Sequence, residues 1–282
     1  MPLPSQVACV EIGGVPISLA TTDEYFFKLL MKRYEGFQSS TSAEFELNFE
    51  IVEALAVSDC DVRVRKDGQG QEGEWLIERG DFLSRWDPRT GKGLVRQNAN
   101  PYSLDSVLRI VHSLILAERG GFLLHAASAI CDGRAYLFSG VSGAGKTTMT
   151  RLAPPDVMLL SDEISYIRPC NPRNDNAAYQ AFGTPFAGEL AKAGENTKAG
   201  IGALFFLEHG PENRIDKMLP AEAVRRLMRN ILFFANDPAL VEKLLASACD
   251  FVAGTPIRRL TFYPDSKVWD EVRNFDGVPA HV

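Results

Sequence analysis

The sequence predicts an α/β domain with a mixed sheet over residues 101–282, preceded by a smaller β-rich α+β domain over residues 1–100. In the first hundred residues, short runs alternate apolar and polar positions, which is typical of strands that bury one face. Beyond residue 100 the apolar spacing lengthens to that of helices, and residues 202–207 form a fully apolar run typical of a strand covered on both faces. A chain of 282 residues suits two domains of ordinary size.

The N-terminal hundred residues begin with two strand-like runs, 7–12 and 15–19, on either side of Gly13-Gly14. Two glycines between alternating runs predict a tight hairpin. A helix is expected over residues 24–33, capped by Thr22 or Asp23. Further strands are expected at 44–52, 61–65, 74–78, 81–87 and 93–97. The region holds no cluster of chemically active side chains, and its expected role is recognition of an acceptor molecule.

The segment from 101 to 139 predicts a helix followed by a hairpin. Apolar residues recur at three- and four-residue steps over 101–119, and Gly120-Gly121 ends that pattern. Two strands, 122–131 and 134–139, are joined by Asp132-Gly133, a strong hairpin signal. The second of these strands is therefore expected to run antiparallel to the first, which a simple βαβ order would not produce.

Residues 140–147 match G-x-x-x-x-G-K-[ST], the phosphate-binding P-loop, in the expected place after an apolar strand. The glycines let successive backbone N–H groups converge on one anion, and the following helix directs its positive end to the same phosphates. Lys146 would reach the β- and γ-phosphates and the Thr147 hydroxyl would bind Mg²⁺. The alternative is a glycine-rich turn that matches by accident. The predicted nucleotide-binding residues are Gly140, Ser142, Gly143, Ala144, Gly145, Lys146, Thr147 and Thr148.

The next apolar run, 157–160, ends in Ser161-Asp162-Glu163. Pro154-Pro155 keep the preceding helix short, so this strand is expected beside the P-loop, with its carboxylates near Mg²⁺ and the γ-phosphate. Adjacent residues of a strand point to opposite sides, so one acid could bind metal while the other faces the acceptor. An exposed acidic turn is the alternative.

The remaining chain predicts mostly regular elements. Strands are expected at 179–182, 202–207 and 257–263, and helices at 221–234, 238–252 and 266–274. Glu195, Asn196 and Lys198 follow a turn and are weaker candidates for contact with a γ-phosphate, a solvated loop being the alternative.

Four features together resemble the catalytic half of HPr kinase/phosphorylase: His125, the Asp132-Gly133 hairpin, the P-loop, and Asp162-Glu163. The order of these motifs matches over about residues 121–208. That family shares its core with ATP-dependent phosphoenolpyruvate carboxykinase, so the resemblance implies a mixed-sheet P-loop kinase domain of this type. Residues 220–274 look more like relatives of HPr kinase from bacterial biosynthetic and surface-modification clusters.

By that resemblance Asp162 is the general base that takes the proton of the acceptor hydroxyl, and His125 orients that hydroxyl. Lys146 completes the catalytic set. Thr147 and Glu163, with Asp162, are the implied Mg²⁺ ligands; the family usually has Ser and Asp at the first two positions, and both replacements keep an oxygen ligand. Without the resemblance, the sequence favours a core or hairpin histidine at position 125, and the resemblance reverses that preference. HPr kinases are hexamers, which implies a homo-oligomer.

The function expected from these residues is transfer of the γ-phosphate of ATP to a hydroxyl, with a serine of a peptide or protein as the first choice of acceptor. A small-molecule kinase on the same core and a non-catalytic ATP-sensing regulator are the alternatives. ATP is favoured over GTP because the chain lacks an N/T-K-x-D guanine-reading segment.

Composition excludes other classes of function. The net charge of −6 argues against a nucleic-acid partner, since such proteins carry clustered basic surfaces. No apolar run approaches the ~18 residues of a membrane span, so no membrane insertion is expected. The five cysteines show no C-x-x-C spacing, and the N-terminus has no signal-peptide pattern, so a cytoplasmic protein with reduced thiols is expected.

Overall fold

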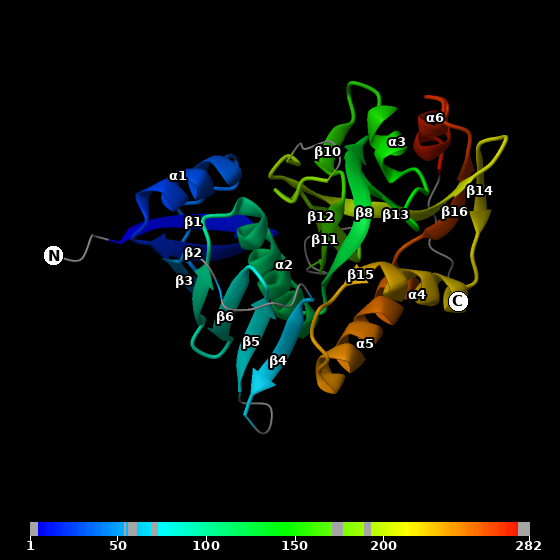
Figure 1. The fold of residues 1–282 in the computed structure, drawn as a ribbon. Coiled ribbons are helices and arrows are strands. Elements are labelled where there is room, and N and C mark those ends of the chain that lie inside the picture. The colour runs from blue at the N-terminus through cyan, green and yellow to red at the C-terminus, as the bar shows by residue number, and fades with distance from the viewer. Residues whose placement is uncertain are drawn as a thin grey trace. The chain divides into compact units, whose positions relative to one another are not determined.

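The computed structural model describes residues 5–53, 55, 61–68, 73–170, 177–188 and 193–275. The chain divides into two compact units, drawn in Figure 1. Unit 1 comprises residues 1–115 and 233–238, and unit 2 comprises residues 116–232 and 239–282. The border falls inside a helix, and the predicted domain boundary at residue 100 stays a prediction.

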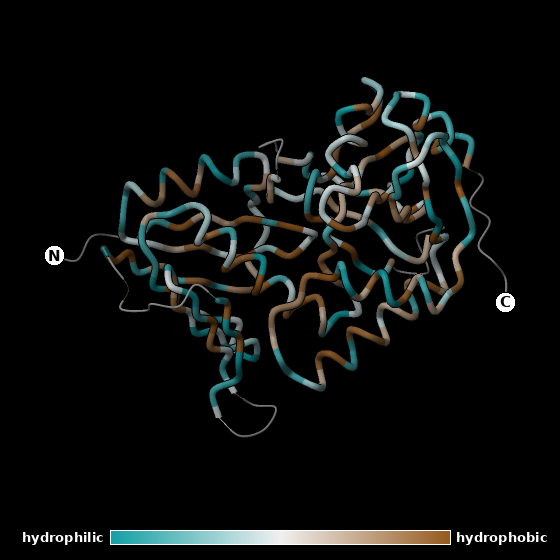
Figure 2. The backbone as a smooth tube through the Cα atoms, turned by 45° about the vertical axis from the view of Figure 1, so that its right-hand side comes forward, coloured by the Kyte–Doolittle hydropathy of each residue, from teal (hydrophilic) through white to brown (hydrophobic). Residues whose placement is uncertain are grey.

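In its described residues, unit 1 is a seven-stranded sheet with two helices. Its elements are β1 (Gln6–Ile12), β2 (Val15–Thr21), α1 (Glu24–Arg33), β3 (Phe45–Ile51), β4 (Arg63–Asp67), β5 (Glu74–Arg79), β6 (Phe82–Asp87), β7 (Lys92–Gln97) and α2 (Pro101–Glu118), which continues into unit 2. The strand order is β1-β2-β3-β7-β6-β5-β4. Buried and exposed residues alternate along β3, as expected for a strand with one buried face, and hydrophobic and hydrophilic segments of the whole chain are coloured in Figure 2.

The predicted N-terminal elements are confirmed. β1 and β2 are antiparallel, and Gly13 and Gly14 both have positive φ angles of 62° and 71°, as a type I′ turn requires. Asp23 caps α1, because its carboxylate accepts a 2.7 Å hydrogen bond from the N–H of Phe26. Phe26 and Leu30 are fully buried on the inner face of α1, which lies against β1 and β2.

Unit 2, as far as the structure describes it, contains a nine-stranded sheet and four short or medium helices besides the end of α2. Its elements are β8 (Phe122–Cys131), β9 (Arg134–Ser139), α3 (Lys146–Arg151), β10 (Met158–Ser161), β11 (Ile164–Pro169), β12 (Tyr179–Phe182), β13 (Lys198–His209), β14 (Arg214–Lys217), α4 (Pro220–Asn230), β15 (Ile231–Leu232), α5 (Pro238–Gly254), β16 (Ile257–Phe262) and α6 (Val268–Arg273). Its aromatic core includes Phe138, Phe205 and Trp269, all at most 1% exposed.

The predicted fold class is wrong for unit 2. Five strands close into a ring, because β8 pairs with β11, β11 with β12, β12 with β13, β13 with β9, and β9 with β8. The chain is 40% strand and 27% helix, and this β-rich ring differs from the expected α/β kinase sheet. The ring closes because the long strands change partner midway: residues 122–125 of β8 pair with β11 and residues 126–131 with β9.

Several local predictions for unit 2 are nevertheless confirmed. β8 and β9 have the predicted bounds and are antiparallel, with Asp132 and Gly133 both at positive φ in the turn. The predicted helix over 221–234 is too long: α4 ends at Asn230, because Ile231 and Leu232 pair with β8 as β15. In the described part of the chain, no helix is long and apolar enough to cross a membrane.

Candidate functional site

The P-loop sequence forms the connection between β9 and α3. Gly143 and Gly145 have φ angles of 78° and 106°, in the region that only glycine adopts without strain. At Gly145 an added Cβ would also lie 2.4 Å from Cζ of Phe262, so this position has room for no side chain. Ala144 is buried, and its N–H donates to the carbonyl of Val141 at 3.1 Å, which tightens the loop.

Lys146 begins α3 and turns back over the loop. Its ammonium group donates to the carbonyls of Gly140 at 3.1 Å and Val141 at 3.4 Å, and the residue is only 9% exposed. The cation therefore sits within the concave side of the loop, where the β- and γ-phosphates of a P-loop nucleotide lie.

The acidic pair occupies the link between β10 and β11. Both strands pair antiparallel with β8. This pairing is interrupted only at Asp162 and Glu163. The Ser161 hydroxyl accepts hydrogen bonds from the N–H groups of Glu163 at 3.2 Å and Ile164 at 2.9 Å. β10 does not pair with β9, the strand that leads into the P-loop, because β8 lies between them.

Most residues of the predicted site line one cavity of about 340 Å³. α3 and β8, which contact each other beside it, are seen in Figure 1. The residues that line the cavity come from β8, the P-loop, α3 and the acidic link: His125, Ser142, Gly143, Gly145, Lys146, Thr147, Thr148, Arg151, Asp162 and Glu163. Of the predicted set, Ala144 is buried under the loop and Gly140 lines a neighbouring cavity.

His125 projects from β8, opposite Ile164 of β11 in the strand register. Burial and then the charge of Lys146 lower the pKa of His125 below its usual 6.5. Its imidazole is therefore neutral near pH 7, with one ring nitrogen able to accept and the other to donate a hydrogen bond.

Gly188 belongs to the site but was not predicted as a site residue. Its main-chain N–H donates a 2.8 Å hydrogen bond to Oδ1 of Asp162, whose residue is 5% exposed. A Cβ at position 188 would meet Cβ of Glu163 at 2.7 Å. The turn-rich composition of residues 183–189 was the available signal; residue 189 lies outside the described part.

His209 and Phe262 are further residues that the sequence did not single out. Ring nitrogen Nε2 of His209 donates to the carbonyl of Gly143 at 2.8 Å, and the His209 and Phe262 rings lie 5.5 Å apart. Both residues end strands, β13 and β16, that belong to one parallel set with β9. Because parallel strands bring their carboxyl ends to one edge, these side chains reach the loop that follows β9.

The donors around the acidic link suit Mg²⁺. Asp162 and Glu163 offer carboxylates and Thr147 a hydroxyl, all hard oxygen ligands. Within the described ranges, no group of three or more His, Cys, Asp and Glu side chains could hold a metal ion by itself. This combination fits Mg²⁺, which is usually bound by one or two carboxylates together with substrate phosphates and water.

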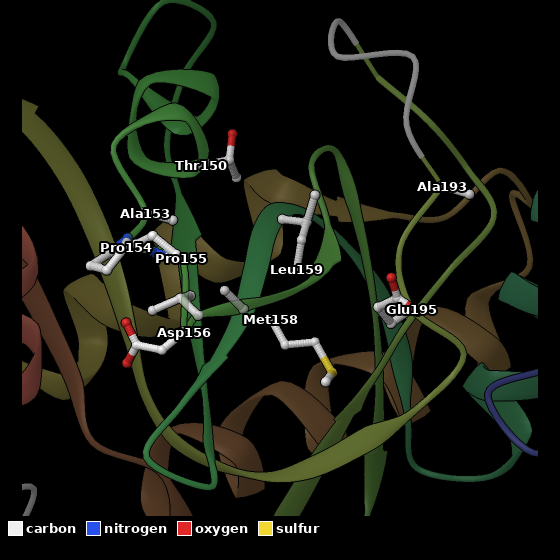
Figure 3. Close-up of a pocket in the computed structure, with 11 residues that line it drawn as sticks. Thr150, Ala153, Pro154, Pro155, Asp156, Met158, Leu159, Ala193 and Glu195 are labelled. Carbon is white, nitrogen blue, oxygen red and sulfur yellow. The ribbon is translucent and has the colours of Figure 1, made fainter.

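The weaker candidates Glu195 and Lys198 lie elsewhere. Glu195 lines a different cavity of about 440 Å³, where it faces Pro154 and Pro155 across Leu159 (Figure 3). The Lys198 ammonium lies over the ring of Phe182, 5.5 Å from its centroid. Asn196 lies in the bend between them.

The family comparison corrects the resemblance. Residues 96–274 match the model of ScmC, described as SynChlorMet cassette protein ScmC, and the chain belongs to that family. The expected membership of the HPr kinase/phosphorylase family is therefore wrong, as is the expected kinase-type sheet. No curated protein matches the sequence.

Proposed function

We propose that this ScmC-family protein is an ATP-dependent kinase that transfers the γ-phosphate to a hydroxyl group, with a serine of a peptide or protein as the first choice of acceptor. One observation carries the proposal: the P-loop, Lys146, Thr147, Asp162 and Glu163 line a single cavity. The family's name specifies no activity, so the proposal rests on the site itself.

The roles follow from the positions of the side chains. Backbone N–H groups of the loop and the Lys146 ammonium bind the phosphates and neutralise charge that develops during transfer. Asp162 takes the proton of the acceptor hydroxyl, and the hydrogen bond from Gly188 fixes one of its oxygens. The hydroxyl oxygen bonds to the γ-phosphorus while the bond from that phosphorus to the bridging oxygen breaks and ADP leaves.

His125 is proposed to orient the acceptor. Its lowered pKa supports a neutral ring beside Lys146, and a neutral ring adds no second positive charge to this wall of the cavity.

Mg²⁺, held by Thr147, Glu163 and Asp162, would supply further charge neutralisation. A cytoplasmic location is part of the proposal, because ATP is available there, and the net negative charge supports acceptors other than nucleic acid.

Lys146→Ala tests the nucleotide site. The variant should lose binding of ATP and ADP, measured by isothermal titration calorimetry, while its far-ultraviolet circular dichroism matches the wild type. Lys217→Ala is the matched control, because Lys217 is an exposed lysine of β14 outside the cavity. Unchanged nucleotide affinity in Lys146→Ala would refute the phosphate-site assignment.

Asp162→Asn separates catalysis from binding. The amide keeps the size of the carboxylate but cannot take the proton, so transfer of labelled γ-phosphate to peptide and protein acceptors should fall by about a hundredfold or more. ADP binding should persist. Asp250→Asn, at an exposed position of α5, is the control. Transfer at the wild-type rate in Asp162→Asn would remove the general-base role.

A further inference from the structure

A second cavity adjoins the phosphate site within unit 2. Its volume is about 700 Å³, and it shares His125 and Ser142 with the phosphate-site cavity. Its other lining residues come from the start of the P-loop, the end of β13 and one face of α4: Gly140, Val141, Phe206, Leu207, Glu208, Arg225, Arg226, Arg229 and Asn230.

The terminal phosphate of a bound nucleotide would lie at the border of the two cavities. A P-loop lysine reaches the β- and γ-phosphates, and the Lys146 ammonium lies against the carbonyls of Gly140 and Val141. Both of these residues line the second cavity. An acceptor that occupies this cavity would therefore lie next to the γ-phosphate.

The arginines of α4 differ in what they bind. Arg226 donates to Glu208 at 2.8 Å and pairs with Glu222 at 2.9 Å, and Arg259 pairs with the same two carboxylates at 3.3 and 3.1 Å. This network satisfies Arg226 and neutralises Glu208. The cavity therefore keeps no uncompensated negative charge on that wall.

Arg225 and Arg229 are outside this network. They are exposed, lie one helical turn apart on α4, and form no ion pair or hydrogen bond within the described part of the chain. Two guanidinium groups on one face of a cavity can bind a carboxylate or phosphate through paired N–H donors.

We propose that Arg225 and Arg229 bind an anionic group, a carboxylate or a phosphate, of the acceptor whose hydroxyl takes the γ-phosphate. The proposal rests on the proposed function for the identity of the reaction. The anionic group is unchanged in the reaction: the hydroxyl oxygen bonds to the γ-phosphorus, its proton goes to Asp162, and ADP leaves. A free hydroxy acid and an acidic residue beside a serine present the same chemistry to the two arginines.

The test measures binding of defined probes to the full chain saturated with ADP and Mg²⁺. The probes are glycerate, a free hydroxy acid, and a serine peptide flanked by glutamates, with the glutamine-flanked peptide as its uncharged control. Arg225→Gln/Arg229→Gln is compared with Arg134→Gln/Lys217→Gln, which removes the same charge from exposed positions outside the cavity. Isothermal titration calorimetry gives the dissociation constants.

The wild type and the control variant should bind at least one anionic probe, and the Arg225/Arg229 variant should bind it about tenfold or more weakly. Preference for glycerate identifies a small acid, and preference for the glutamate peptide identifies an acidic peptide. Equal dissociation constants in all three proteins, or no binding of either probe to the wild type, would overturn the inference. Failure of the wild type to bind ADP, measured first, would instead refute the proposed function.

Discussion

The main-chain N–H of Gly188 holds Oδ1 of Asp162 at 2.8 Å, across a separation of 26 positions in the chain. A backbone donor cannot rotate away as a side chain can, so it fixes one oxygen of a buried carboxylate. The same glycine lets the backbone pass close to Glu163, since an added Cβ would lie 2.7 Å from Cβ of that residue. The loop therefore positions both acids together.

Gly188→Ala should weaken Mg²⁺-dependent nucleotide binding by about tenfold, because the acids must shift to admit the methyl group. Titrations of ADP with Mg²⁺ and with EDTA provide the measurement and its internal control. Affinity without Mg²⁺ depends on the P-loop and should change little. Equal losses under both conditions would mean that the methyl group disturbs the phosphate site and not the acidic link.

Gly145→Ala should be much more disruptive than Gly143→Ala. Both positions have positive φ, which costs about 1–2 kcal/mol for alanine. Only at Gly145 does the new Cβ also collide with Phe262, at 2.4 Å, whereas at Gly143 it meets nothing within 4 Å. Urea unfolding and ADP titration of the two variants measure the difference.

The double variant Gly145→Ala/Phe262→Leu completes this comparison. The smaller side chain removes the collision but leaves the backbone strain, so the double variant should recover part of the stability lost in Gly145→Ala. If Gly145→Ala and Gly143→Ala proved equally stable, the contact with Phe262 would not constrain the loop.

His125 should make the protein less stable on the acid side of neutrality. Its pKa is lowered in the folded chain, chiefly by burial and then by Lys146, relative to the usual 6.5. The unfolded chain therefore binds a proton more readily as the pH falls below about 6.5, and this proton uptake favours unfolding. Above that pH both states are neutral and the contribution to stability is complete.

Urea unfolding at pH 5 and pH 8 tests the effect of His125. The difference in unfolding free energy between the two pH values should be smaller in His125→Gln than in the wild type, because glutamine does not titrate. An identical difference in the two proteins would show that His125 has the same pKa in the folded and unfolded chains.

The sequence predicts the local parts of this structure well. The hairpins at Gly13-Gly14 and Asp132-Gly133 follow from turn residues with positive φ, and the bounds of α1 follow from its cap at Asp23 and its apolar spacing. The loop over residues 140–147 is equally local, because a continuous stretch of residues forms it, and its binding of phosphate stays a prediction. These features need no knowledge of distant neighbours.

Pairing between distant strands was not predictable in the same way. An apolar run predicts a strand but not which partner it takes, so neither the ring nor the change of partner within β8 could be read from its residues. Ile231 and Leu232 continue the apolar pattern of α4 yet pair with β8, which is why the predicted helix was too long. β14 has no counterpart among the predicted strands. Gly188 and His209 likewise reach the site only through the assembled fold.

Asp105→Ala should destabilise unit 1 by about 3 kcal/mol, since it leaves the Arg33 guanidinium and the buried Tyr34 hydroxyl without their acceptor. Arg33 Nε donates to Oδ1 of Asp105 at 3.2 Å, and the Tyr34 hydroxyl donates to the same atom at 2.7 Å. Asp105 is 3% exposed. Lys28→Ala removes an exposed ion pair with Glu24, which solvent screens, and should change the stability far less. Urea unfolding compares the two, and similar losses would contradict the buried role of Asp105.

His209→Ala should weaken ADP binding by about threefold to tenfold, since the loop loses the donor that holds the Gly143 carbonyl at 2.8 Å. His209 is exposed at the end of β13, so the global stability should change little. His209→Gln offers an amide donor near the same place and should recover part of the affinity. ADP titrations of both variants decide the matter, because wild-type affinity in His209→Ala would mean that the glycines alone shape the loop.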